Sequence, residues 1–198
     1  MTTSARFLGL AALGLVAILG CKDTGSTSAS SNPSTPTATT LAYVDPTAGT
    51  YLLKKNTTLS TTSHLVLDLV GPAATTGSGI SATFSADTAK VTWTNVSALD
   101  PANTLVQGGG TFNLGSAPQI LKGKVVGSTL QVAAAQKGIG SPVSLNGPLL
   151  RIALDLKASQ ATGAVAFSAP SANHQSQLLD ATGNLVDITV TVGTLTAQ

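Results

Sequence analysis

The chain has 198 residues, of which only 9% are charged, and its formal net charge is +2. This composition excludes a coiled coil, which needs many Glu, Lys, Arg and Leu residues, and it lacks the basic excess expected of a nucleic-acid binder. The chain has one Cys, which excludes an internal disulfide and a Cys-based zinc site.

Residues 1–20 predict an export signal. Arg6 precedes an uncharged run of 14 residues over 7–20, which is shorter than the about 20 residues that span a bilayer. The run ends in Ile-Leu-Gly-Cys at 18–21, which resembles the lipobox of bacterial lipoproteins. The resemblance implies that the Cys21 thiol receives a diacylglyceryl group and that its amine, freed by cleavage, receives an acyl chain. The alternative is a plain signal peptide with an incidental Cys.

Residues 21–40 predict a lipidated Cys followed by a flexible Ser/Thr/Pro linker. No aliphatic side chain larger than Ala occurs over 22–40, so burial cannot offset the entropy of ordering this segment. By resemblance to lipoproteins of Gram-negative bacteria, Lys22 in place of Asp after the Cys implies release to the outer membrane. We therefore expect a lipid-anchored protein of the cell envelope, in the outer membrane if the host is Gram-negative.

Residues 41–198 predict one all-β domain. Apolar residues alternate with polar ones in five segments, and this period of two is typical of half-buried strands. Gly, Pro, Asn and Asp between the segments predict frequent turns and eight to ten strands, whereas no stretch carries a sustained helical pattern. The pattern favours an antiparallel β-sandwich or jelly roll. The five segments are 64–70, 79–85, 90–96, 149–156 and 185–192.

The order of four segments resembles the cohesin-like β-sandwich, which is related in fold to family 2 and family 3 carbohydrate-binding modules. They are the strand 64–70, the run from Gly79 through Asp87 to Trp93, the stretch 130–163, and the run 179–196. Together they cover most of residues 60–196. The resemblance implies a binding module, with a dockerin-like protein or a polysaccharide as partner, and it assigns no ligand-binding residues to this chain.

Few side chains suggest chemistry. Asp45, Asp87, Asp100 and Asp180 lie in predicted turns, where an Asp commonly caps backbone N–H groups. Asp180 begins a stretch, 180–184, that is similar to a calcium loop but lacks the terminal Glu of an EF-hand, so a turn with Gly at positive φ is expected. We assign no catalytic residue, metal ligand or cofactor.

The two histidines, His64 and His174, have no triad signature such as G-x-S-x-G near them. We expect both to be exposed and without an assigned role.

Sugar recognition commonly uses exposed aromatic rings, and the candidates here are few. Trp93 shares a face with Val91 and is expected in the core, whereas Tyr43 and Tyr51 lie near the start of the domain and are expected to be exposed; Phe112 and Phe167 complete the set. Two functions remain open. One is a non-catalytic, lipid-anchored module that holds a polysaccharide or a protein. The alternative is a structural lipoprotein that assembles an envelope filament or secretion machine by strand addition at a sheet edge.

Overall fold

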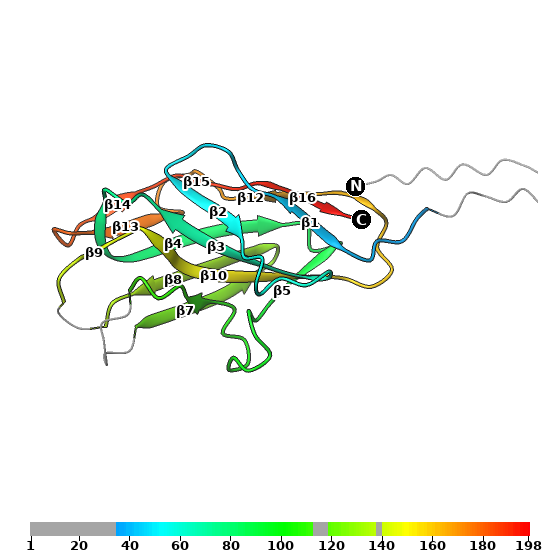
Figure 1. Cartoon of the computed structure of the whole chain (residues 1–198), viewed down its shortest axis with the longest axis horizontal. Helices are drawn as coiled ribbons and strands as arrows, with labels where there is room; N and C mark the ends of the chain where they lie inside the picture. The colour runs from blue at the N-terminus through cyan, green and yellow to red at the C-terminus, as the bar shows by residue number, and fades with distance from the viewer. Residues whose placement is uncertain (1–34, 113–118, 138–139) are drawn as a thin grey trace, which may run out of the picture. The chain divides into compact units, whose positions relative to one another are not determined.

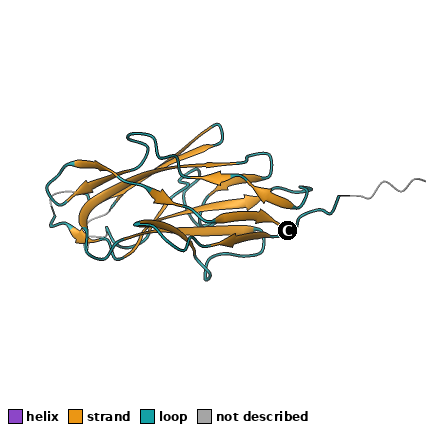
Figure 2. Ribbon diagram, turned by 90° about the horizontal axis from the view of Figure 1, so that it is seen from above, coloured by secondary structure: helices purple, strands orange, loops and turns teal. Residues whose placement is uncertain are grey.

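The computed structural model describes residues 35–112, 119–137 and 140–198, and these residues form strands, turns and loops without a helix (Figures 1 and 2). The all-β prediction is therefore confirmed. Sixteen strands are present in the described residues, and ten of them have four or more residues. The sequence analysis predicted eight to ten strands. The additional strands have two or three residues and pair briefly with longer ones, so turn signals do not reveal them.

One sheet contains six strands in the order β15-β2-β3-β10-β5, with β6 beside β10. All its pairings are antiparallel except β15 with β2. We call it the first sheet. Its strands are β2 (Tyr51–Lys55), β3 (His64–Gly71), β5 (Val91–Thr94), β6 (Gln107–Gly108), β10 (Gly147–Leu156) and β15 (Val190–Thr191).

The second sheet contains seven strands in the order β14-β13-β4-β8-β7, and the short strands β9 and β12 also pair with β4. All its pairings are antiparallel. Its strands are β4 (Thr76–Ala86), β7 (Ile120–Val126), β8 (Thr129–Ala135), β9 (Val143–Ser144), β12 (Phe167–Ser168), β13 (Gln177–Asp180) and β14 (Leu185–Asp187).

A third, small sheet joins the two ends of the domain. Its order is β1-β16-β11, with β1 at Leu41–Val44, β16 at Thr194–Ala197 and β11 at Gly163–Val165. Just before β1, Ala38 is buried and its N–H donates to the carbonyl of Gln160 at 2.7 Å. The compact unit begins at Thr35. Backbone hydrogen bonds from Ala38, Thr39 and Thr40 therefore hold the end of the predicted linker to the domain, which the Ser/Thr composition does not show.

The core lies between the first and second sheets and follows the predicted alternation. In β3 the leucines at every second position, Leu65, Leu67 and Leu69, are fully buried. In β4 the inward residues Ile80 and Phe84 are buried as well. Burying such side chains removes apolar surface from water. The alternation therefore determines which face of each sheet is turned towards the core. The predicted strands at 64–70, 79–85 and 149–156 are confirmed, and the one at 90–96 is shorter, at Val91–Thr94.

The prediction of one strand over 185–192 is wrong. The chain leaves the second sheet after β14 and joins the first sheet at β15, where Val190 pairs in parallel with Tyr51. Val186 is exposed rather than inward, whereas Val190 is buried. Alternation of side chains does not specify which strand supplies the backbone partners, so the change of sheet is not visible in the sequence.

Candidate functional site

Small side chains line the middle of the outer face of the second sheet. On β4 the outward residues are Gly79, Ser81 and Thr83, and they pair with Ala135, Ala133 and Gln131 of β8. Directly paired residues point to the same side of a sheet, so these six positions form one surface. The strand alternation that buries Ile80 and Phe84 therefore also sets this surface.

Longer side chains border this surface on two sides. Lys122 and Lys124 of the edge strand β7 pair with Ala133 and Gln131, and both lysines are exposed. On the opposite side, Gln177 of β13 pairs with Ser81. The result is a hollow of about 530 Å³ lined by residues of β4, β7 and β8 and by the loop residues His174 and Gln175. We call this region the trough.

An apolar row crosses one end of the trough. Register aligns Leu185, Leu179, Gly79, Ala135 and Ile120 across five adjacent strands. Leu185 and Ile120, at the two ends of the row, are 66% and 43% exposed. A smaller hollow of about 180 Å³ lies over the middle of this row and shares Ser81 and Ala133 with the trough. The face thus offers apolar contact beside polar and charged groups.

His174 sits at the polar side of the trough. Its backbone is left-handed, with φ of 64°, and its Nδ1 lies 3.2 Å from Oδ1 of Asp187. Gln177 Nε2 donates to the same Asp187 oxygen at 3.0 Å. The prediction that His174 is exposed is correct. Its position beside the trough was not predicted.

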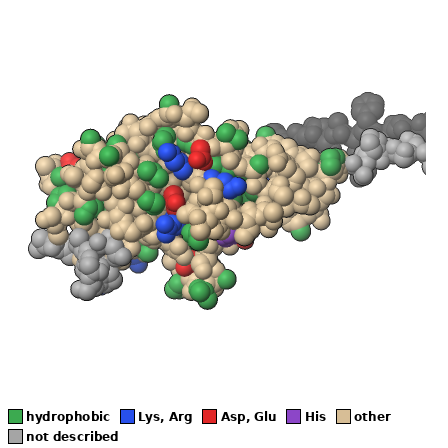
Figure 3. All heavy atoms as spheres, in the orientation of Figure 1, with side chains coloured by type: hydrophobic (Ala, Val, Ile, Leu, Met, Phe, Trp, Pro, Cys, Tyr) green, Lys and Arg blue, Asp and Glu red, His purple; other side chains and the backbone are tan. Residues whose placement is uncertain are grey.

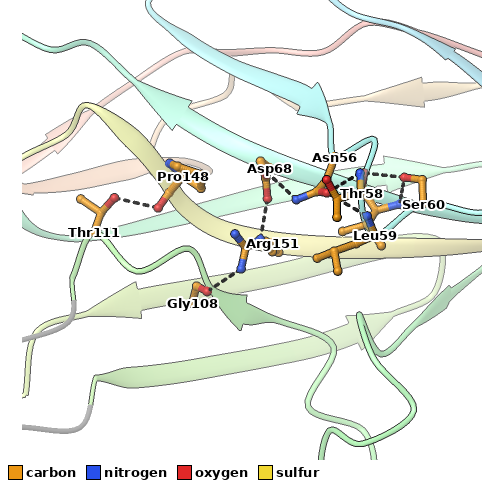
Figure 4. Close-up of polar contacts among 10 residues, drawn as sticks. Asn56, Thr58, Leu59, Ser60, Asp68, Gly108, Thr111, Pro148 and Arg151 are labelled. Carbon is orange, nitrogen blue, oxygen red and sulfur yellow. Dashed lines mark hydrogen bonds and ion pairs between the residues drawn. The ribbon is translucent and has the colours of Figure 1, made fainter.

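Around Asp68 and Arg151, the outer face of the first sheet is closed by polar contacts (Figure 4). Arg151 of β10 donates from Nε to Oδ1 of Asp68 on β3 at 2.8 Å, and Asn56 donates from Nδ2 to the other carboxylate oxygen at 2.9 Å. Arg151 Nη1 also donates to the carbonyl of Gly108 at 3.4 Å. Charged side chains gather over β2, β3 and β10 in Figure 3. These groups satisfy one another and hold neighbouring strands and loops together.

His64 is half-buried, so the prediction that it is exposed is wrong. Its Nδ1 lies 2.6 Å from Oδ1 of Asp155, and its Nε2 lies 3.1 Å from the carbonyl oxygen of Val96. These contacts occur in a hollow of about 640 Å³ that Trp93 also lines. A Ser/His/Asp triad needs one ring nitrogen directed at a hydroxyl. Here a carboxylate and a backbone carbonyl occupy both nitrogens, so the imidazole joins β3, β10 and the segment after β5.

The aromatic side chains of the described residues point inward. Trp93 is buried as predicted, and its Nε1 donates to the carbonyl of Ser128 at 3.1 Å. The prediction that Tyr43 and Tyr51 are exposed is wrong, since both are buried; Phe112 is buried and Phe167 is half-buried. Residues 35–112, 119–137 and 140–198 therefore present no row of exposed aromatic rings on which a sugar could stack.

Tyr43 is buried because its hydroxyl has two backbone partners. The hydroxyl donates to the carbonyl of Leu53 at 2.8 Å and accepts from the N–H of Gly193 at 2.6 Å. Burial raises the pKa of Tyr43 to about 12, against a smaller lowering by the Gly193 hydrogen bond. Burial also raises the pKa of Tyr51. The sequence shows a Tyr near the start of the domain but not these partners, of which Gly193 lies 150 residues away.

The four turn aspartates cap backbone N–H groups as predicted. Asp45 accepts from Lys55, Asp87 from Ala89, and Asp100 from Ser97, at 2.8 to 3.0 Å. Asp180 accepts from the backbone of Asn184 at 2.9 Å and from both backbone and hydroxyl of Thr182 at 2.8 Å. Gly183 has φ of 85°. The stretch 180–184 is therefore the predicted turn, and its carboxylate is used internally.

Cys21 and the residues predicted as signal peptide, 1–20, lie outside the described residues, as does the linker up to residue 34. In the part of the chain that the structure describes, no helix has the length and apolar character to cross a membrane.

The trough itself was missed by sequence reasoning. Its residues lie on strands separated by up to about a hundred positions along the chain, and only the register brings them together. One signal was available: the outward positions of the predicted strand 79–85 are Gly79, Ser81, Thr83 and Ser85, all small or short. A strand whose inward side chains are large and whose outward side chains are small indicates a face of the sheet against which another molecule can pack.

No protein-family model and no curated protein matches this chain. Solved structures do match. The second type II cohesin module of an adaptor scaffoldin from Acetivibrio cellulolyticus has a TM-score of 0.56 at 14% identity, over 74% of this chain and 94% of that one. Type II cohesin A11 from Bacteroides cellulosolvens has a TM-score of 0.56 at 15% identity, over 74% of this chain and 98% of that one.

A third match comes from a type II cohesin–X-dockerin complex of Acetivibrio cellulolyticus, with a TM-score of 0.55 at 13% identity, covering 72% of this chain and 94% of that one. At these identities the likeness shows the fold, which is the cohesin β-sandwich. The prediction of a cohesin-like sandwich is confirmed.

Proposed function

We propose that the domain is a non-catalytic protein-binding module that holds a folded partner against the trough. The observation that carries this proposal is the contrast in side-chain size on the second sheet. Small residues leave the middle of the face open, and Lys122, Lys124 and Leu185 rise at its borders. A protein interface needs a broad surface with apolar contact at its centre and polar groups at its rim.

The matched structures support the choice of a protein partner. Cohesins from Acetivibrio cellulolyticus were solved in complexes with dockerins. Because the identities are 13% and 16%, we propose only the class of partner, a dockerin-like protein module.

The inward orientation of the aromatic rings favours protein over polysaccharide. Sugar rings stack on exposed aromatic faces, and Tyr43, Tyr51 and Trp93 present no such face because all three are buried. The trough is instead lined by hydroxyl, amide and small apolar groups, with Lys122, Lys124 and His174 at its borders, and such a surface suits contact with a protein.

We also propose that Cys21 carries the lipid anchor and that the segment after it links the domain to the cell envelope. The support is the sequence alone, namely the lipobox-like residues at 18–21 and the Ser/Thr-rich stretch that follows. Cys21→Ser should move the protein from the membrane fraction to the soluble fraction, and mass spectrometry should detect acyl chains on the unaltered chain only. An unmodified sulfur in the mature protein would contradict this part of the proposal.

Site-specific cross-linking tests partner binding. A photoreactive amino acid replaces Gln131, an exposed residue that lines the trough, and the matched control places it at Thr92, an exposed residue on β5 of the first sheet. In living cells we expect one protein to be captured in stoichiometric amounts at position 131 and not at position 92. Capture at position 92 alone, or at neither position, would reject docking in the trough.

A further inference from the structure

The edge strand β7 has an unpaired side. In the sheet order it lies at one end, beside β8, and within the described residues no strand pairs with its other side. Its seven residues are exposed or half-buried throughout, and it lies at the margin of the sheet in Figure 1. A long exposed edge strand presents backbone N–H and C=O groups on which another chain can pair.

The hairpin geometry identifies the free backbone groups. β7 and β8 are joined by Gly127 and Ser128, and Val126 pairs with Thr129 across this two-residue turn. Gly127 has φ of 62°, which suits the first position of a tight hairpin turn. The residues flanking such a turn bond to each other, and bonding then alternates along the strand. Leu121, Gly123 and Val125 therefore direct their N–H and C=O groups away from β8.

Charge determines which strand fits. Lys122 and Lys124 are exposed on the outer face of β7, between the residues with free backbone groups. If a second copy paired antiparallel about Gly123, Lys122 of each copy would lie opposite Lys124 of the other. Like charges directly opposite are destabilising. A strand with carboxylates at alternate positions would place opposite charge there instead.

The inner side of the edge also restricts the partner. A Cβ placed on Gly123 would lie 2.4 Å from the carbonyl oxygen of Thr104, so the loop after β5 packs closely beneath this strand. Residues of an incoming strand that face inward beside Gly123 must therefore be small. The edge accepts a pattern in which acidic residues alternate with small ones.

We propose that β7 binds an extended acidic segment of a partner protein, which adds to the second sheet as an antiparallel strand. This contact shares Lys122 and Lys124 with the border of the trough, but it differs from docking in the trough because it uses the backbone of the edge rather than the small side chains of β4 and β8. It is also the type of contact that an envelope assembly protein would use.

Amide hydrogen exchange by nuclear magnetic resonance tests this proposal in the full chain. The probe is a seven-residue peptide in which Asp alternates with Thr, capped at both ends, and the control peptide has Lys in place of Asp. At millimolar acidic peptide, exchange should slow about threefold or more at Leu121, Gly123 and Val125. Lys122 and Lys124 amides, already bonded to β8, should not change.

Three variants separate the edge from the trough. Val125→Pro removes one free N–H without removing a bond to β8, and prolines are tolerated on edge strands; it should abolish the protection, whereas Val125→Ala should retain it. Ala133→Trp fills the trough and should leave the protection unchanged. If the trough proposal fails but the edge proposal holds, the acidic peptide still protects the three amides although no partner binds in the trough.

Three results would overturn the proposal. The acidic peptide could shift the lysine side-chain signals without slowing the three amides, which would indicate simple charge attraction. Both peptides could protect the edge equally. The three amides could also become protected with rising protein concentration in the absence of peptide, which would show that a second copy occupies the edge.

Discussion

The outer faces of the two main sheets differ in how their side chains are used. On the first sheet, Asp68, Arg151 and Asn56 bond to one another across strands and loops, and His64 joins three segments. On the second sheet, Ser81 and Ala133 leave a hollow, with lysines standing at its border. Polar groups that satisfy each other stabilise the fold, whereas a face of short side chains is free to meet another molecule. Both outer faces carry a hollow, of about 640 Å³ beside His64 and of about 530 Å³ in the trough, so the two sheets differ in how far their polar side chains bond to one another.

The largest expected effect comes from filling the open face. Ala133→Trp should weaken binding of the partner identified by cross-linking about 100-fold, equivalent to roughly 2.7 kcal/mol, because an indole would occupy the hollow. The free energy of unfolding should change by less than about 1 kcal/mol, since the residue is half-buried on an outer face. Titration calorimetry and urea unfolding measure the two quantities.

Thr92→Trp is the matched control, because it adds the same side chain to the outer face of the first sheet. It should leave binding intact. Equal loss of binding in both variants would end the distinction between the two faces.

The next largest effect comes from removing the ion pair between Asp68 and Arg151 on the first sheet. Asp68→Ala leaves the guanidinium of Arg151, whose side chain is only 25% exposed, without its carboxylate. An unpaired, partly buried charge should lower the free energy of unfolding by about 2 kcal/mol, less than for a fully buried pair. Urea unfolding gives this value.

Lys124→Ala, on the open face, should change stability by less than about 0.5 kcal/mol. The double variant Asp68→Leu with Arg151→Met should recover most of the loss, because it removes both charges. A loss for Lys124→Ala as large as that for Asp68→Ala would contradict the view that only the first sheet is closed by charge.

A smaller effect concerns the junction between the first and third sheets. Tyr43→Phe removes a donor to Leu53 and an acceptor for Gly193, and should cost about 1–2 kcal/mol in unfolding free energy. The pH dependence has a definite sign. The pKa of Tyr43 rises from 10.0 to about 12 on folding, so the folded state holds this proton more tightly. Its contribution is complete below pH 10 and is lost as pH rises towards 12.

Unfolding measured from pH 9 to 12 should therefore show a smaller decline in Tyr43→Phe than in the unaltered chain. Some decline should remain, because burial also raises the pKa of Tyr51. An identical decline in both proteins would show that the Tyr43 hydroxyl is not shielded as described.

The smallest expected effect is local to the turn between β13 and β14, which follows Leu179 of the apolar row. Hydrogen bonds from Asn184 and Thr182 lower the pKa of Asp180. Its contribution is therefore present above the ordinary value of 3.8 and is lost as pH falls below it. Asp180→Asn should speed amide exchange at Thr182 and Asn184 and leave the trough signals unchanged. Unchanged exchange would show that the carboxylate does not hold the turn.

Much of the fold could be predicted from the sequence, because alternation reports which side chains are buried. The inward leucines of 64–70 and the buried Trp93 followed from it, and the capping role of Asp180 followed from turn chemistry. The change of sheet within 185–192 could not be predicted, because it depends on backbone partners. Burial of Tyr43 likewise depends on a hydroxyl reaching Gly193, 150 residues away.

The candidate site was harder to predict than the fold, since it depends on register between strands. Nothing local to Lys122 shows that it stands beside Ala133, and nothing local to Leu185 shows that it shares a row with Ile120. The size of outward side chains along each strand is the part of the site that the sequence does contain.

The order of strands in the small third sheet has a consequence for how the molecule is made. β16 is its central strand, and among the described strands β1 and β11 each pair only with β16. During translation β1 emerges first and has no strand to pair with until β16, near the end of the domain, has been synthesised. The third sheet can therefore form only after β16 has been synthesised, so the domain cannot complete its folding while it is still being translated.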